Sequence, residues 1–242
     1  MSKTVIITGA SKGIGKACAE KFYTMGYNIA AVYRSDDEGM RSFCHGKDTS
    51  RILLIKADVS DFDAMQNMAN KVATQFGSID VLVNNAGIAE QKMMNDITPS
   101  DWDRMFDVNV KGMFNTTKAV MDTMIHNKWG RIINISSIWG ISGASCEVHY
   151  SASKAAVIGF TKALAKEFGP SGITVNCVAP GVIDTAMNKN IDKETINELK
   201  EQTPLMKIGT AREVAEAVAF FASSASSFIT GQTLVSDGGF IL

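Results

Sequence analysis

The sequence predicts an α/β protein in which a doubly wound parallel sheet carries helices on both faces. Short apolar runs of strand length alternate with longer amphipathic stretches of helical spacing along most of the chain. The short runs are rich in β-branched residues and almost continuously apolar, which is typical of parallel strands buried on both faces.

The expected strands and helices follow one another in order. Strands are predicted at residues 5–8, 29–33, 52–55, 81–83, 132–135 and 174–178, with a last strand at 233–235. Helices are predicted at residues 15–25, 62–76, 101–126, 153–168, 192–202 and 212–222. Residues 181–210 interrupt the alternation near the carboxyl end of a strand, where an α/β enzyme often keeps its substrate lid.

Length and composition indicate one globular domain, residues 1–242. The chain has 242 residues, of which 45% are hydrophobic and 20% charged, and it shows no linker, repeat or low-complexity tract. The formal net charge of −1 provides no electrostatic argument for nucleic acid or for an anionic membrane. No apolar run reaches membrane-spanning length, and the N-terminus lacks the pattern of a signal peptide.

The cysteines argue against a metal centre. They form no Cys-x-x-Cys pair and no histidine cluster accompanies them; their positions are Cys18, Cys44, Cys146 and Cys177. Free thiols in a reducing cytosol are the better interpretation. We therefore expect a cytoplasmic protein with no metal.

A glycine-rich turn, Thr8-Gly-Ala-Ser-Lys-Gly-Ile-Gly15, follows the first strand and opens the first helix. Glycine permits a tight turn and a close approach of the backbone to a pyrophosphate, and the helix N-terminus then offers unpaired N–H groups to that anion. The spacing is Gly-x-x-x-Gly-x-Gly, and a plain strand-to-helix turn is the alternative. Its position after the first strand favours a dinucleotide site.

The end of the second strand bears on the choice of cofactor. An acid there would bind the ribose 2′-hydroxyl of NAD, whereas a cation would meet the 2′-phosphate of NADP. Arg34 occupies this position and Lys12 lies in the glycine-rich turn, so NADP (NADPH) is favoured, although Asp36 and Asp37 lie nearby. The alternative for Arg34 is a solvated surface cation. Asp58, after the third strand, is expected at the adenine edge.

A serine, a tyrosine and a lysine form a candidate catalytic set. Tyr150 and Lys154 are four residues apart and share one face if they lie on a helix, and Ser137 follows the fifth strand. A free tyrosine has a pKa of about 10, but a neighbouring ammonium favours the phenolate and lowers that pKa. Tyr150 would then give a proton to a carbonyl oxygen while hydride reaches the carbon. Each residue alone has an ordinary structural explanation, whereas all three in this order after a phosphate loop favour catalysis.

These motifs resemble the short-chain dehydrogenase/reductase family over nearly the whole chain. The matching residues are the turn Thr8–Gly15, Asn84-Asn-Ala-Gly87, Asn109, Ser137, Tyr150, Lys154 and Pro180-Gly181. The resemblance implies a single-domain Rossmann sheet and catalytic roles for Ser137, Tyr150, Lys154 and Asn109, the last through a water in a proton relay. It implies that the segment after Gly181 borders the nicotinamide and covers the substrate. The expected cofactor contacts are Gly9, Ser11, Lys12, Gly13, Ile14, Gly15, Arg34, Ser35, Asp58, Val59, Asn85, Ala86, Gly87, Tyr150, Lys154, Pro180, Gly181 and Ile183.

Within that family the chain is most similar to bacterial 3-oxoacyl-acyl-carrier-protein reductases of fatty acid biosynthesis. The C-terminal residues 228–234 and 237–239 resemble the segment that packs their homotetramer. Those reductases dock the acidic acyl carrier protein on two basic positions, which correspond here to Lys128 and to Ser171. Loss of one cation weakens electrostatic steering without abolishing it.

Residues 137–147 resemble instead a branch of reductases that act on 5-aminopentanone attached to elongation factor P. Glu147 lies three residues before Tyr150 and is a candidate contact for a cationic amine; the alternative is an exposed loop acid. Ser137 and Tyr150 complete the expected substrate contacts. An alternative of another class is a catalytically silent NADP-binding sensor, against which the complete Ser/Tyr/Lys/Asn set argues.

Overall fold

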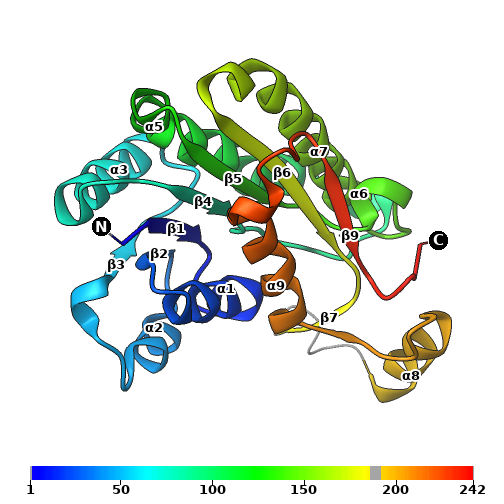
Figure 1. Ribbon diagram of the computed structural model, residues 1–242. Helices are drawn as coiled ribbons and strands as arrows, with labels where there is room; N and C mark the ends of the chain where they lie inside the picture. Colours follow the sequence, from blue (N-terminus) through cyan, green and yellow to red (C-terminus); the bar gives the residue numbers. More distant parts are fainter. Residues whose placement is uncertain (1, 186–191, 242) are drawn as a thin grey trace.

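The computed structural model describes residues 2–185 and 192–241 (Figure 1). In these residues one parallel sheet has the strand order β3-β2-β1-β4-β5-β6-β9. The strands are β1 (Thr4–Thr8), β2 (Asn28–Tyr33), β3 (Ile52–Lys56), β4 (Val81–Asn84), β5 (Gly130–Ile135), β6 (Ile173–Pro180) and β9 (Thr233–Ser236). The predicted doubly wound parallel sheet is confirmed.

Helices cover both faces of the sheet, as the apolar runs predicted. Successive residues of a strand point to opposite faces, so Val5 and Ile7 join one core while Ile6 of the same strand joins the other. The first core contains residues of α1 (Gly13–Thr24), α2 (Asp37–Cys44) and α9 (Ala211–Ala222). The second contains residues of α3 (Phe62–Phe76), α5 (Gly112–Asn127) and α7 (Val148–Phe168).

The strand order places a crevice between β1 and β4. The chain runs from β1 to β2 and β3 on one side, and then returns to β4, β5 and β6 on the other. The connections after β1 and β4 therefore leave in opposite directions at the carboxyl edge of the sheet. Open α/β sheets bind their ligands at this kind of switch point.

Several elements differ from the sequence expectation. The helix predicted at 101–126 is interrupted: α4 (Pro99–Phe106) passes into a π-helical turn, η3 (Asp107–Lys111), before α5 begins. The α4 start is set by Thr98, whose hydroxyl and the Asp101 carboxylate form a capping box, and by Pro99 in the first turn. Helix α2 was not predicted, because its eight residues are too few for a clear periodic pattern.

Helix α7 begins at Val148, five residues before the predicted start, and a short helix α6 (Trp139–Ser142) precedes it. The predicted interruption at 181–210 contains β7 (Ile183–Asp184), α8 (Lys193–Gln202) and β8 (Gly209–Thr210), with β7 pairing to β8. Residues 186–191 of the expected substrate lid lie outside the described residues. Among the described residues, no helix combines the length and apolarity needed to cross a membrane.

Candidate active site

The turn after β1 depends on its glycines. Gly9 and Gly13 have φ values of +67° and +54°, a region that favours glycine. A Cβ on Gly15 would lie only 2.1 Å from the carbonyl oxygen of Gly9. The turn therefore folds back tightly on the first residues of α1. The N-cap residue of that helix, Lys12, makes no side-chain cap hydrogen bond, which fits an N-terminus that offers its N–H groups to an anion.

Hydrogen bonds join this turn to the loop after β4. The Thr8 hydroxyl oxygen accepts from the backbone N–H groups of Asn85 and Ala86, each at 3.0 Å. Asn85 Nδ2 donates to the carbonyl oxygens of Thr8 and Gly9 at 2.9 and 3.2 Å. The two loops of the switch point are thus held together by residues of the predicted Asn-Asn-Ala-Gly motif and by Thr8.

A cleft runs along this edge of the sheet. Most of the predicted cofactor contacts line it: Gly9, Ser11, Lys12, Gly13, Ile14, Arg34, Ser35, Asp58, Val59, Asn85, Ala86 and Gly87. Gly15 is not among the lining residues, because it lies behind the turn against Gly9 and Asn85. Seven further residues line the cleft but were not predicted as contacts: Val32, Tyr33, Asp36, Ala57, Ile88, Val108 and Thr185. The position of Ile88 directly after the Asn-Asn-Ala-Gly motif is the signal that could have identified it.

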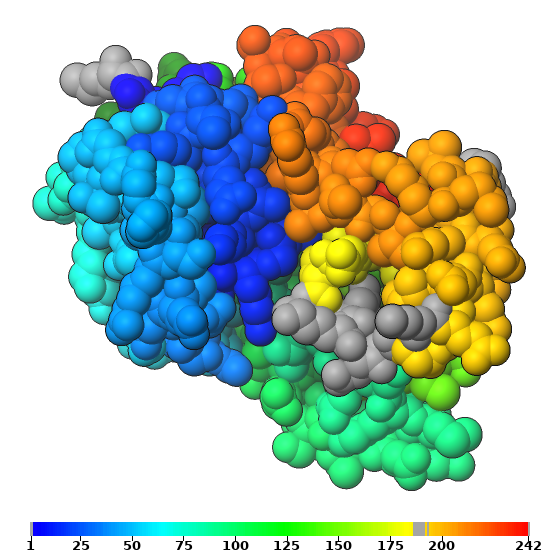
Figure 2. All heavy atoms as spheres, turned by 90° about the horizontal axis from the view of Figure 1, so that it is seen from below, coloured from blue at the N-terminus to red at the C-terminus, as the bar shows by residue number. Residues whose placement is uncertain are grey.

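Arg34 lies at one end of the cleft. Its guanidinium is 3.9 Å from the Asp58 carboxylate, and its side chain is 59% exposed. The cleft thus has a largely exposed cation beside the carboxylate that the sequence placed at the adenine edge. In Figure 2 the dark blue N-terminal segment and the gold segment with α8 lie on either side of the yellow residues around β7.

The other end of the cleft holds the predicted catalytic set. A second pocket shares Ile14, Asn85, Gly87, Ile88 and Thr185 with the first and adds Ser137, Tyr150, Lys154, Pro180, Gly181 and Ile183. Ser137, Tyr150 and Lys154 are 7%, 8% and 5% exposed. Because α7 begins before Tyr150, both Tyr150 and Lys154 belong to one helix. The structure therefore brings together three side chains that are up to 17 positions apart in the sequence.

Burial shifts the pKa values of both helix residues, in opposite directions. It raises the pKa of Tyr150 to about 12, although a hydrogen bond with Ser137 lowers that pKa and the charge of Glu147 raises it further. Burial also lowers the pKa of Lys154 to about 8. In the protein alone, desolvation thus outweighs the lowering of the tyrosine pKa that we expected from a neighbouring ammonium. Lys154 Nζ donates to the carbonyl oxygen of Ile135 at 2.9 Å.

Asn109 lies in the π-helical turn and is 2% exposed. Its Oδ1 accepts from the Ile88 N–H at 2.8 Å, and its Nδ2 donates to the Ile88 carbonyl at 2.9 Å and to the Ser153 hydroxyl at 3.0 Å. Asn109 and Lys154 also border one small internal cavity of about 10 Å³. Single π-helical turns often occur at functional sites, and this one aims an amide at the loop beside the cleft.

Two further predicted residues lie apart from the catalytic set. Lys128 follows α5 and precedes β5, at the amino end of that strand, whereas Ser137 follows its carboxyl end. The Lys128 carbonyl packs against Gly172, so Ser171 is on the same edge of the sheet as Lys128. The structure does not bring either residue to the Tyr150 end of the cleft within one chain.

Glu147 is the N-cap residue of α7, three residues before Tyr150. It is partly buried, and burial raises its pKa, while a hydrogen bond from Gln91 Nε2 at 3.3 Å and the nearby His149 lower it. It does not line the two pockets described above. Its charge nevertheless raises the pKa of Tyr150.

The sequence pattern of a family described as enoyl-(acyl carrier protein) reductase matches residues 9–241. The acetoacetyl-CoA reductase of Shinella zoogloeoides is 41% identical over 240 residues, which cover 99% of this chain and 98% of that protein. The 3-oxoacyl-[acyl-carrier-protein] reductase FabG of Chlamydia muridarum is 39% identical over 242 residues, with 99% and 97% coverage.

Two solved structures superimpose on nearly the whole chain with a TM-score of 0.93 each. One is a short-chain dehydrogenase/reductase, described as a glucose/ribitol dehydrogenase, from Brucella melitensis; it is 34% identical, and the match covers 99% of this chain and 97% of that chain. The other is ElxO with NADP bound, 36% identical, with 100% and 99% coverage.

Proposed function

This chain belongs to the short-chain dehydrogenase/reductase family, and we propose that it uses NADPH to reduce a ketone to a secondary alcohol. The proposed substrate is a 3-oxoacyl thioester carried by acyl carrier protein. The main supporting observation is the buried Ser137, Tyr150 and Lys154 set at one end of a cleft whose other end carries Arg34. Relatives named for 3-oxoacyl and acetoacetyl thioesters support this substrate class.

We expect the dinucleotide to lie along the length of this cleft. The glycine turn and the N-terminus of α1 would hold the pyrophosphate, with Lys12 beside it. Arg34 would bind the 2′-phosphate. The part of the cleft beside Asp58 would receive the adenine. NADP bound to the similar ElxO structure supports this assignment. When bound, the cofactor supplies the hydride.

The protein itself supplies the proton. Because burial keeps the pKa of Tyr150 near 12, the phenol holds its proton at neutral pH and can donate it from Oη to the carbonyl oxygen of the substrate. The Ser137 hydroxyl would hydrogen-bond the same oxygen. The charge on Lys154 would then stabilise the phenolate that remains.

A water relay would return the proton to Tyr150. The small cavity between Asn109 and Lys154 has about the volume that one water requires. Asn109 is held by Ile88 and Ser153, so its amide is a fixed wall of that cavity. We propose that a water there exchanges protons with Lys154.

The C-terminal residues supply a proposed contact for a homotetramer. Phe228 is fully exposed, and Leu234 and Val235 on the edge strand β9 are 39% and 37% exposed. A parallel edge with exposed apolar side chains is suited to pairing with another copy. Analytical ultracentrifugation would show a tetramer if this proposal is right, and a smaller species if it is wrong. We place the protein in the cytoplasm and treat residues 1–242 as one functional domain.

Glu147 favours a second candidate, reduction of 5-aminopentanone on elongation factor P. A partly buried carboxylate near Tyr150, with Gln91 as its hydrogen-bond partner, is suited to receive an ammonium group. The placement of Lys128 away from the catalytic set also removes one argument for carrier docking beside this site in the same chain.

A comparison of turnover rates, made with one preparation of the enzyme, tests these proposals. NADPH oxidation is followed by absorbance with an acetoacetyl thioester and with elongation factor P that carries the aminopentanone group. Faster turnover of the thioester would support the first proposal, and faster turnover of the modified factor would support the second. Tight NADPH binding with no turnover of any ketone would favour the sensor and refute both.

A further inference from the structure

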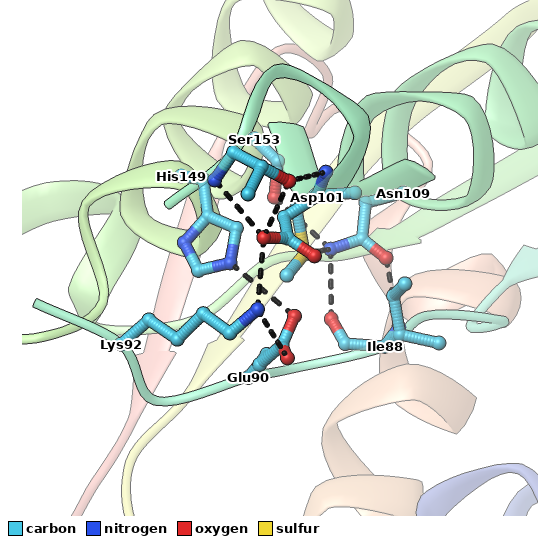
Figure 3. Close-up of polar contacts among 9 residues, drawn as sticks. Ile88, Glu90, Lys92, Asp101, Asn109, His149 and Ser153 are labelled. Atoms are coloured by element: carbon cyan, nitrogen blue, oxygen red, sulfur yellow. Dashed lines mark hydrogen bonds and ion pairs between the residues drawn. The ribbon is translucent and has the colours of Figure 1, made fainter. Parts of the chain in front are cut away.

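A cluster of charged side chains lies beside the candidate active site (Figure 3). Lys92 Nζ is 2.8 Å from Asp101 Oδ2 and 3.2 Å from Glu90 Oε1. The side chains of Lys92 and Asp101 are only 31% and 18% exposed. Glu90 and Lys92 belong to the loop after β4, whereas Asp101 is in the first turn of α4. The cluster therefore ties that loop to a helix.

Residues 88–92 of this loop, which we call the clamp loop, are also held by hydrogen bonds at both ends. At the first end, the Asn109 amide holds both the N–H and the carbonyl of Ile88. At the other end, the Lys92 N–H donates to the Cys146 carbonyl at 2.8 Å. Cys146 has a φ of +60°, which is uncommon for a residue other than glycine. Strain of this kind persists only where surrounding contacts hold it.

A buried histidine connects the cluster to the catalytic helix. His149 is 0% exposed and immediately precedes Tyr150, and in the described structure neither of its ring nitrogens has a hydrogen-bond partner. Its Nε2 is 3.9 Å from Glu90 Oε2. Glu90 thus faces a buried ring on one side and Lys92 on the other. The ion pair with Lys92 keeps Glu90 beside His149. Because His149 directly precedes Tyr150, the cluster also bears on the position of the candidate proton donor.

The clamp loop also borders the cofactor cleft. Ile88 lines both the dinucleotide part of the cleft and the pocket with Tyr150 and Lys154. A displacement of this loop would move Ile88 relative to Tyr150. Misplacement of reacting groups by about 1 Å can cost roughly 100-fold in rate.

We propose that Lys92 is a positioning residue. It fixes the clamp loop between α4 and the start of α7 and so keeps Ile88 and Tyr150 in constant positions relative to each other. Lys92 lines neither part of the cleft, so it acts through its neighbours. This inference rests on the proposed reductase chemistry for its effect on rate, but the clamp itself does not depend on which ketone is reduced.

The first experiment compares Lys92→Met with Lys92→Arg and with Lys21→Met. Lys21 is a matched control, because it also links two separate elements through an ion pair, here α1 and α9 through Glu216 at 2.5 Å, and its side chain is 30% exposed. We expect Lys92→Met to lower kcat about tenfold or more while the Kd of NADPH changes less than about threefold. Lys92→Arg, which keeps the cation, should restore most of kcat. Lys21→Met should leave kcat near the wild-type value.

A second measurement does not need turnover. Amide hydrogen exchange in the NADPH-free protein reports local opening. Lys92→Met should speed exchange at residues 88–92 and 146–150 and leave β1 and α1 unchanged. Glu90→Gln is a milder change that retains the Lys92–Asp101 pair, and it should increase the exchange rate less in the same segments. This variant keeps the test valid if Lys92→Met fails to fold.

Unchanged exchange in both segments for the folded variants would overturn the clamp. So would equal losses of kcat in Lys92→Met and Lys92→Arg, or a loss in Lys21→Met as large as that in Lys92→Met. If the wild-type protein reduces no ketone, the proposed function fails and the exchange measurement alone decides the clamp.

Discussion

Replacement of Lys154 by methionine should stabilise the cofactor-free protein while abolishing its turnover. Lys154 is 5% exposed, and burial lowers its pKa to about 8. Methionine retains an unbranched apolar stem and removes the charge. The change therefore eliminates a desolvated ammonium whose proposed use is in catalysis, and function at a cost in stability is common at active sites.

The magnitude follows from the shift of the pKa. A decrease from 10.5 to about 8 corresponds to about 3 kcal/mol by which burial disfavours the charged form. Loss of the hydrogen bond from Nζ to the Ile135 carbonyl would cost about 1 kcal/mol. The net expectation at pH 7 is a gain of about 2 kcal/mol in the free energy of unfolding. For a chain of this size that corresponds to a rise of about 4–8 °C in Tm.

The advantage of the methionine variant should shrink as the pH rises. Below about pH 8 the lysine is protonated in both the folded and the unfolded wild type, so the full penalty is present. Between about pH 8 and pH 10.5 the unfolded lysine still binds a proton that the folded lysine has released. Wild-type stability therefore rises relative to the variant by about 1.4 kcal/mol per pH unit in this window.

The assay is urea denaturation of both proteins without cofactor at pH 7 and pH 9.5, at one protein concentration. Lys162→Met is a matched control, because Lys162 is exposed on the same helix; its effect should be within about 0.5 kcal/mol at both pH values. A Lys154→Met protein less stable than the wild type at pH 7, or a gap that does not change with pH, would refute the reasoning.

Four further substitutions test the site. Tyr150→Phe should reduce kcat about 10²–10⁴-fold with NADPH binding retained, and a near-normal kcat would remove Tyr150 from the mechanism. Arg34→Ala should raise the KM for NADPH about tenfold or more relative to that for NADH, because it removes a contact of about 1.5–3 kcal/mol; equal effects on both cofactors would contradict this role. Glu147→Gln should lower kcat/KM about tenfold for a substrate with an ammonium group and hardly change it for an acetoacetyl thioester, whereas equal effects would return Glu147 to an ordinary loop acid. Gly15→Ala should cost about 1–3 kcal/mol of stability in thermal unfolding, because its Cβ would lie 2.1 Å from Gly9 O and 2.5 Å from Asn85 Nδ2. The control Gly159→Ala, where a Cβ meets nothing within 4 Å, should be neutral or stabilising. Similar losses of stability in both variants would be inconsistent with a tight turn at Gly15.

Local patterns in the sequence determined the strands of the sheet and the position of the cofactor turn. Each predicted strand corresponds to an observed one within two residues at either end, because burial on both faces demands continuous apolar runs that are visible without tertiary information. The helix at Phe62–Phe76 was predicted with the observed bounds, since Asp61 caps its start and Gly77 ends it in the left-handed conformation.

Contacts between distant segments decided the rest. The π-helical turn around Asn109 could not be read from periodicity, because its amide is held by Ile88 and Ser153, which lie 21 and 44 positions away. The same holds for the charged cluster of Lys92 and for the placement of Lys128 at the far edge of the sheet. A sequence identifies which side chains can carry charge or protons; which of them meet, and how deeply they are buried, depends on the packing of α4, α7 and the loop after β4. Burial then raises the pKa of Tyr150 and lowers the pKa of Lys154, so the direction of both shifts was decided only by the tertiary structure.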